Sequence, residues 1–154
     1  MRKSQVKKVQ KILCYIDLSK PSHHVVEYAH MVAKCMGAEL FVLHTVTDIK
    51  RSAGFYVPHI NTDKLEEEMS NAAQDKLYAV CMQSMGECEI DPGRRIVKRG
   101  DALEVMDEII RANEIDLLVI GHEVGSLSMF KTDYITKYLK DPACPVLAVP
   151  IKGE

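Results

Sequence analysis

Short apolar runs alternate along this chain with longer segments in which apolar residues recur every three or four positions. Nearly continuous apolar runs are typical of strands buried on both faces, and the three-to-four spacing is typical of amphipathic helices. The runs expected to form strands are KILCYI (11–16), ELFVLHTV (39–46), RRIVKRG (94–100), IDLLVIG (115–121) and Val146–Val149. The segments expected to form helices are 22–36, 62–85, 102–113 and 132–140.

This order of elements restricts the fold. Strand, helix and strand in succession favour right-handed crossovers between parallel strands, with helices covering the sheet. The sequence therefore predicts an α/β fold, namely a single doubly wound five-stranded parallel sheet with helices on both faces, Rossmann-like in type. The 154 residues fit one domain at 11–151, preceded by a basic arm at 1–10 that we expect to be flexible. Residues 49–62 lack a period and are expected to form a surface loop.

Composition narrows the class of function. The net charge is −2, and the one basic segment is short and terminal, so we expect no nucleic-acid partner. No apolar run has the length of a membrane span, and the start lacks a secretory signal, which predicts a cytoplasmic protein without membrane contact. The five cysteines form no CxxC pair, so we expect buried free thiols rather than disulfides or a zinc site.

The candidate site lies where the predicted strands end. In open parallel sheets, ligands bind beyond the carboxyl ends of the strands, near the point where the strand order reverses. Asp17, Thr45 and the segment after Gly121 all fall on that edge. Asp17 has two interpretations that the residues leave open: it contacts a ribose or base, or it caps the following segment SKPSHH (19–24).

Histidine and serine residues were considered as catalytic or metal-binding groups. His23, His24 and His30 share one predicted helix, but their spacing does not bring them to one ion, so we expect no metal. His44 lies within an apolar strand and is interpreted as a hydrogen-bonded buried histidine. Ser126 and Ser128 have no evident base to activate them, and no catalytic residues are predicted.

Five stretches together resemble the universal stress protein family. In chain order they are KILCYIDLS, LHTV, RGDALEVMDEI, IDLLVIG and ACPVLAVP, covering about Lys11 to Pro150. The resemblance implies an adenine nucleotide alpha hydrolase-like fold with five parallel strands, a role in the stress response and, usually, a homodimer formed through the last strand, here Val146–Val149. It also implies that ATP binds in part of the family only.

The phosphate loop of the nucleotide-binding members reads G-x2-G-x9-G-[S/T] after the fourth strand. Gly121 matches its first glycine, but Val124 occupies the second glycine position and Gly125 comes one residue late. The closing Gly-Ser pair falls near Thr132 and Asp133, and the loop is about two residues short. If a nucleotide binds, the resemblance and the residues together assign Asp17, Thr45, Gly121, Gly125 and Thr132 to its site.

Charge adds to this departure from the family pattern. The Asp133 carboxylate would disfavour a nearby phosphate by on the order of 1 kcal/mol per charge pair in wet surroundings. Lys131 and His122 would offset part of this repulsion, and a divalent ion would allow Glu123 or Asp133 to contact a phosphate through the metal.

Three hypotheses for function follow. The preferred one is a non-catalytic, dimeric regulatory or interaction module with weak or no nucleotide binding, so no cofactor. The second is an ATP-binding member that acts as a nucleotide-dependent switch. The third is a slow nucleotide hydrolase, for which the sequence supplies no evident group to orient water. A phosphoacceptor receiver domain, which would have a similar fold, rests only on Asp17.

Overall fold

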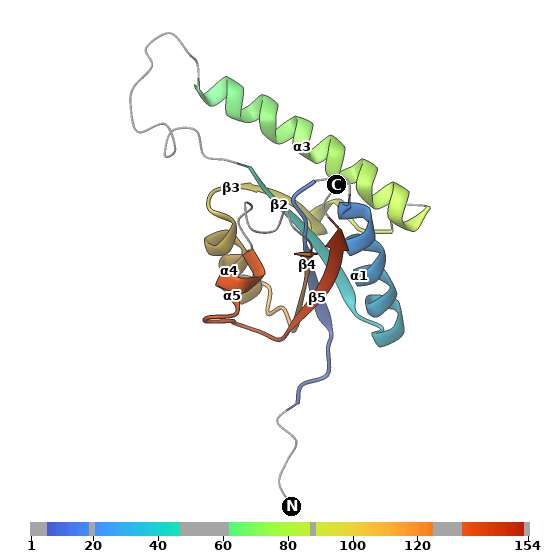
Figure 1. Ribbon diagram of the computed structural model, residues 1–154. Helices are drawn as coiled ribbons and strands as arrows, with labels where there is room; N and C mark the ends of the chain where they lie inside the picture. The colour runs from blue at the N-terminus through green and yellow to red at the C-terminus, as the bar shows by residue number, and fades with distance from the viewer. Residues whose placement is uncertain (1–5, 19–20, 47–61, 87–88, 125–133, 153–154) are drawn as a thin grey trace, which may run out of the picture.

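The computed structural model describes residues 6–18, 21–46, 62–86, 89–124 and 134–152. A five-stranded sheet with the order β3-β2-β1-β4-β5 forms its centre, and the pairs β1–β2, β1–β4, β2–β3 and β4–β5 are all parallel (Figure 1). The predicted fold class is therefore confirmed. Because β2 and β3 lie on one side of β1, and β4 and β5 on the other, the strand order reverses between β1 and β4.

The elements follow the predicted alternation of strands and helices. The strands are β1 (Lys11–Tyr15), β2 (Glu39–Val46), β3 (Arg95–Arg99), β4 (Leu117–Val124) and β5 (Val146–Lys152). The helices are α1 (Ser22–Met36), α3 (Thr62–Met85), α4 (Ala102–Ala112) and α5 (Tyr134–Tyr138), and a 3-10 turn, η1 (Pro92–Arg94), precedes β3. Residues 6–10, the described part of the predicted arm, have no regular secondary structure.

Helices cover the two faces of the sheet and create two separate cores. Alternate residues of a strand point to opposite faces, so Ile12 and Cys14 pack under α1 and α3, while Leu13 and Tyr15 pack under α4 and α5. Figure 1 shows α1 and α3 on one side of the sheet and α4 and α5 on the other. These buried aliphatic layers hold the strand ends in register, and the register positions the candidate site.

Helix termini follow the signals in the sequence. The amide of Glu104 donates to the Asp101 carboxylate at 3.1 Å, which satisfies a free N–H at the start of α4 as predicted. Gly37 ends α1 in the left-handed conformation at φ 63°, where a side chain is strained, and its amide bonds the last carbonyls of the helix.

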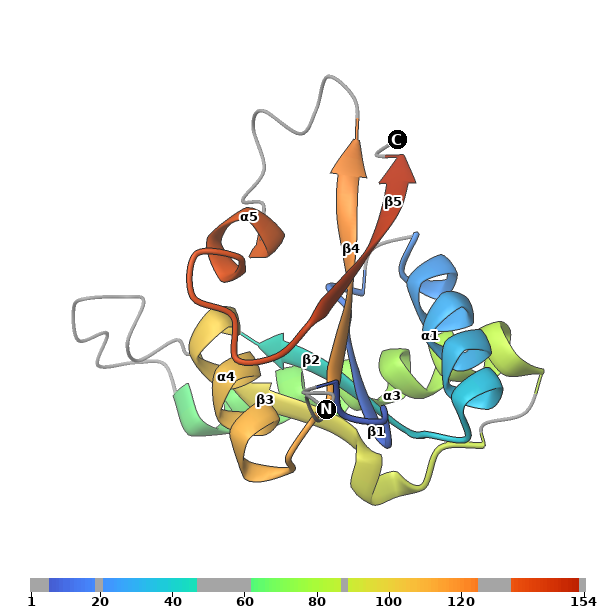
Figure 2. The same cartoon turned by 90° about the horizontal axis from the view of Figure 1, so that it is seen from below.

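Two strands are longer than the sequence indicated. We expected the fourth strand to end at Gly121, but β4 continues through Val124, and Gly121–Val124 pair with Val149–Lys152 of β5. β1 ends at Tyr15, which pairs with Ile120 of β4. The part of β4 after Ile120 extends beyond β1, and among the described strands only β5 pairs with it. Figure 2 shows β4 and β5 extending beyond the other strands.

Pro150 was expected to end the last strand and instead lies inside β5. The amide of Leu118 donates to the Pro145 carbonyl at 2.9 Å. Because backbone groups alternate between the two sides of a strand, this bond directs Leu147, Val149 and Ile151 toward β4 and directs Pro150 outward. The missing N–H of Pro150 therefore faces the free edge of the sheet, the one side where a strand tolerates proline.

Candidate functional site at the carboxyl edge of the sheet

The carboxyl ends of β1 and β4 meet where the strand order reverses, which is the usual ligand position in such sheets. Asp17 follows β1. Thr45 is the penultimate residue of β2 and pairs with Lys98 of β3. The structure thus places Asp17 and Thr45 at one edge, together with residues 122–124, the described start of the segment after Gly121. Gly125 and Thr132 lie outside the described residues, as do Ser126, Ser128, Lys131, Asp133 and all of the predicted loop except Thr62.

Asp17 has an exposed side chain that supports the start of α1. Its Oδ1 accepts a hydrogen bond from the Ser22 hydroxyl at 3.2 Å, and Ser22 is almost fully buried at the first position of the helix. The N-cap position itself is Pro21, which makes no side-chain cap. Asp17 therefore supports the helix through the side chain of Ser22, while its carboxylate remains at the surface of the edge.

The hydroxyl of Thr45 is hydrogen-bonded to a side chain of the neighbouring strand β1. Its Oγ1 lies 3.0 Å from the hydroxyl of Tyr15, a residue of β1 that is buried against α4 and α5. Either oxygen can donate in this pair. This hydrogen bond uses a donor or acceptor position of the Thr45 hydroxyl, so fewer positions remain for a ligand.

His44 is a hydrogen-bonded, half-buried histidine, as interpreted from the sequence. Its Nδ1–H donates to the carbonyl of Ile16 at 2.8 Å, which fixes the tautomer and ties β2 to the residue before Asp17. Burial lowers the pKa of His44 below its ordinary value, an effect that the Ile16 carbonyl and the nearby Asp17 charge partly oppose. The ring is therefore neutral at neutral pH and positions the chain at Asp17.

Gly121 was expected to be the last residue of the fourth strand, at the start of a phosphate loop, but β4 continues past it to Val124. A Cβ added to Gly121 would lie 3.1 Å from the Val25 Cγ2 atom of α1 and 3.1 Å from the Ile151 Cδ1 atom of β5. Contacts this short are tighter than almost all real Cβ contacts, so the position favours glycine for packing between a helix and two strands. His122 and Glu123, the next two residues, are also half-buried strand residues.

A buried ion pair borders the same edge and was missed in the sequence. The carboxylate of Glu66 on α3 is 2% exposed and pairs with the half-exposed guanidinium of Arg99 at the end of β3. The LEEEM stretch suggests a solvated face, yet position 66 lies on the same helical stripe as Ala73, Leu77 and Cys81, which are buried. That periodicity is the signal that identifies Glu66 as an inward-facing acid.

The remaining polar groups of the described residues do not form a metal centre. His30 bonds Glu89 at 3.0 Å between side chains, and His24 lies at the exposed surface of α1. Within 6–18, 21–46, 62–86, 89–124 and 134–152, no three His, Cys, Asp or Glu side chains lie close enough to hold an ion. In the same part of the chain, no helix combines the length and the apolar character that crossing a membrane requires.

The strand order and the helices on both faces define an α/β protein with a doubly wound parallel sheet. The model of the Universal stress protein family matches residues 8–150. The chain therefore belongs to the universal stress protein family, as the resemblance in the sequence indicated. A search of curated proteins found no match.

Solved structures share this fold at low sequence identity. A universal stress protein family member from Burkholderia pseudomallei is 19% identical, with a TM-score of 0.65 and coverage of 94% of this chain and 98% of its own. UspA from Lactobacillus plantarum is 18% identical, with a TM-score of 0.63 and coverage of 93% and 99%. A universal stress protein in complex with cAMP is 16% identical, with a TM-score of 0.56 and coverage of 94% and 98%.

Proposed function

We propose that this universal stress protein is a non-catalytic regulatory or interaction module that binds nucleotide weakly or not at all. The observation that carries the proposal is the continuation of β4 through Val124 in a ladder with β5. The family's phosphate loop would begin at Gly121, where backbone amides must be free to face an anion. In this chain the alternation along β4 directs the amides of His122 and Val124 into the ladder instead.

Charges at the edge act in the same direction. Asp17 and Glu123 bring carboxylates to the carboxyl ends of β1 and β4. Each would repel a phosphate by on the order of 1 kcal/mol in wet surroundings. The Arg99 guanidinium, a cation at this edge, is already paired with the buried Glu66. The described part of the edge therefore supplies little net attraction for a triphosphate.

Nucleotide binding as a switch is the second candidate function. One structural neighbour is a universal stress protein in complex with cAMP, and Asp17 and Thr45 stand at the edge where a nucleoside would lie. A slow nucleotide hydrolase would also require positioned cations and a group that orients an attacking water, so we rank it below a binding switch.

Thermal unfolding with millimolar Mg-ATP or cAMP separates the two candidates. Ligand at a hundredfold its Kd stabilises a protein by roughly 2.7 kcal/mol, which a melting curve resolves easily. The proposal predicts no shift with either nucleotide. A shift that Asp17→Ala removes, and that a matched exposed-acid variant, Glu108→Ala, leaves in place, would establish the switch instead.

Self-association through β5 is part of the proposed function. The two edge strands of the sheet differ in charge. β3 carries the basic residues Arg95, Lys98 and Arg99, and charged side chains on an edge strand disfavour pairing with another strand. On β5 only Lys152 is charged, and the outward edge of the strand lacks a backbone N–H only at Pro150. We therefore assign the homodimer contact to β5. A protein that sediments as a monomer at micromolar concentration would contradict this assignment.

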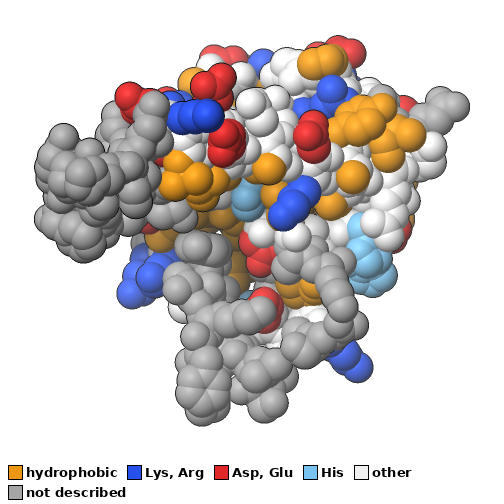
Figure 3. Space-filling view, turned by 90° about the horizontal axis from the view of Figure 1, so that it is seen from above, with side chains coloured by type: hydrophobic (Ala, Val, Ile, Leu, Met, Phe, Trp, Pro, Cys, Tyr) orange, Lys and Arg blue, Asp and Glu red, His pale blue; other side chains and the backbone are white. Residues whose placement is uncertain are grey.

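Exposed apolar side chains provide further surface for a protein partner. Tyr28 and Met31 on α1 are 47% and 50% exposed, and Tyr78 on α3 is 45% exposed. Figure 3 shows apolar side chains among acidic and basic ones on the face that carries α3. A mixed surface of this kind suits a protein contact better than a nucleic acid, which requires a basic patch.

A further inference from the structure

A stripe of exposed side chains runs along α1 on the side of the helix that faces away from the sheet. Its members follow one another at intervals of four, three and four residues, which places them on one face of the helix. They are His24, Tyr28, Met31 and Cys35, and all four are exposed. We call these four residues the α1 stripe. The buried residues of the helix lie on its opposite side: Val25, Val26, Ala29 and Ala33.

The spacing of the α1 stripe is that of the seam in a pair of packed helices. Alternating steps of four and three residues reproduce the a and d positions of a heptad, through which two helices pack side by side. The centre of the stripe is an aromatic ring and a thioether, Tyr28 and Met31, each about half exposed. Both side chains gain free energy when they are removed from water. The stripe therefore suits contact with another helix.

Two opposite charges lie beside the stripe on one flank of α1. Glu27 and Lys34 are seven residues apart, so they lie on the same flank but are too far apart to pair with each other. The Glu27 carboxylate lies 3.7 Å from His24 Nδ1, and Lys34 Nζ lies 3.6 Å from Glu89. Both side chains remain well exposed in these loose contacts, so both charges are accessible to a partner.

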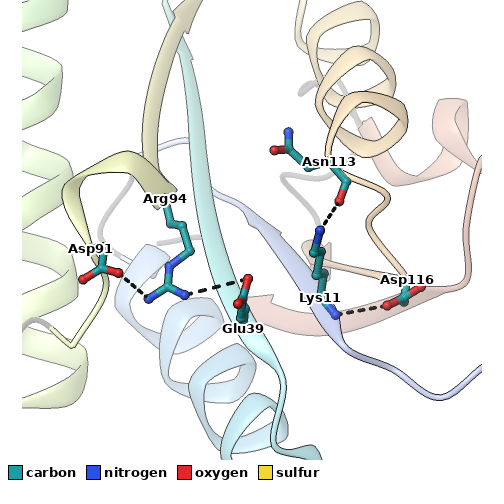
Figure 4. A network of polar contacts seen from close by, with 6 residues as sticks. All are labelled: Lys11, Glu39, Asp91, Arg94, Asn113 and Asp116. Carbon is teal, nitrogen blue, oxygen red and sulfur yellow. Dashed lines mark hydrogen bonds and ion pairs between the residues drawn. The ribbon is translucent and has the colours of Figure 1, made fainter.

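Charges at the amino edge of the sheet are used differently. Figure 4 shows the Arg94 guanidinium between Asp91 and Glu39. These three side chains come from η1, the residue before it and the start of β2, so their contacts join parts of the same chain. The charges beside the α1 stripe are better placed for a contact with another molecule.

We infer that the α1 stripe binds α1 of a second copy of this chain, with the two helices antiparallel. The inference rests on the proposed interaction role and names the partner for this surface. A two-fold axis perpendicular to the helix pair keeps the same flank of both copies on one side and reverses the order of the residues. Glu27 of each copy therefore comes beside Lys34 of the other, which makes the charged flank complementary to itself.

The reversed order also sets the contacts along the stripe. When the midpoints of the two stripes coincide, Tyr28 of each copy lies against Met31 of the other, and His24 lies against Cys35. Contacts between a thioether and an aromatic ring are favourable. The midpoint between the two flanking charges lies within about one residue of the midpoint of the stripe, so one register forms both sets of contacts.

A parallel pair of helices fits these residues less well. It would bring the charged flank of one copy against the opposite flank of the other, where Glu27 would meet the apolar side chain of Val32. The antiparallel contact involves only two helices of 15 residues. It is therefore smaller than a standard interface of about 1,600 Å², and we expect weak association that depends on protein concentration.

Disulfide crosslinking of the full chain tests the inference through His24→Cys. Within one helix, positions 24 and 35 are about 16 Å apart, which a disulfide cannot span, so a bond between them must join two copies. Mild oxidation followed by peptide mapping should find the bond from position 24 to Cys35. Glu108→Cys, an exposed position on α4 across the sheet, is the matched control and should give no bond to Cys35.

Other results of this experiment overturn the inference. A bond between the two Cys35 residues would mean that the helices are parallel. Absence of the bond from position 24 to Cys35 would mean that another molecule or only water covers the stripe. Because the bond reports on α1 alone, its absence in a protein that still sediments as a dimer and ignores nucleotide would leave the β5 contact and the proposed function standing.

Charge reversal provides a second measurement. Glu27→Lys and Lys34→Glu each place like charges opposite one another twice, so self-association of α1 should weaken by about tenfold in the crosslinking yield of His24→Cys. Combining both reversals restores opposite charges and should restore the yield, as should mixing the two single variants. A purely structural role for either residue predicts no such rescue, so a yield that stays low in both cases contradicts the assigned contact.

Discussion

Glycine at position 121 illustrates how one residue supports two different interpretations. In sequence it matches the start of a phosphate loop, and in the structure it lies in β4 with Val25 and Ile151 against it. The absence of a side chain is required by both interpretations, so the residue type alone does not distinguish them. The distinction depends on the neighbours, which belong to a helix about 100 residues earlier and to the last strand.

Gly121→Ala should therefore destabilise the protein by about 1 kcal/mol or more, because the new methyl group overpacks the space between α1 and β5. Gly93→Ala is the matched control, since a Cβ there meets nothing within 4 Å. Denaturant unfolding of both variants measures the difference. Equal stability of the two variants would show that position 121 is not packed as described.

Arg99→Ala should remove about 2 kcal/mol, because it leaves the buried Glu66 carboxylate without its partner. The figure lies below the 3–5 kcal/mol typical of fully buried pairs, since Arg99 is half exposed to water. The neighbouring Lys98→Ala breaks only an exposed pair with Glu108 and should change stability by about 0–1 kcal/mol. A loss no larger than that control, in denaturant unfolding, would contradict the buried pair.

The lowered pKa of His44 predicts a pH dependence of stability. The folded protein binds this proton less readily than the unfolded chain, so the contribution is complete above the ordinary pKa near 6.5. It is lost as the pH falls through the lower folded-state pKa. The free energy of unfolding should therefore drop less steeply toward acid in His44→Gln than in the unsubstituted protein, and parallel pH profiles would refute this role.

At the scale of elements, the sequence predicted the order and type of every described strand and long helix. Periodicity decides those features locally, which is why the α4 cap at Asp101 and the α1 stop at Gly37 were also correct. The ends of β4 and β5 were wrong because each strand extends the other. Val124 and Lys152 form strand through their mutual register, a long-range property that no local pattern contains.

The same alternation gives a test on β5. Val149→Pro removes an amide directed into the β4 ladder and should cost about 3 kcal/mol or more. Pro150→Ala adds an amide on the outward side and should change the stability of the monomer by only a few tenths of a kcal/mol. Urea unfolding compares the two, and similar effects would mean that the strand faces are assigned the wrong way round.

At the scale of the whole molecule, the structure confirms the α/β fold with five parallel strands that the family resemblance implied. The strand order creates one reversal point and places β3 and β5, which differ in charge, at the two edges of the sheet. The helices on the two faces of the sheet create two cores. The missed Glu66–Arg99 pair shows the limit of local reasoning, because its partners are 33 residues apart and come from different elements.

The central claim is that the amides of His122 and Val124 are committed to the β4–β5 ladder and are therefore not offered to phosphate. Amide NMR with hydrogen exchange, recorded with and without millimolar Mg-ATP, tests it directly at His122 and Val124. The account predicts that both amides are protected from exchange in the nucleotide-free protein and do not shift when Mg-ATP is added. Rapid exchange without nucleotide, together with large saturable shifts on adding it, would contradict the account.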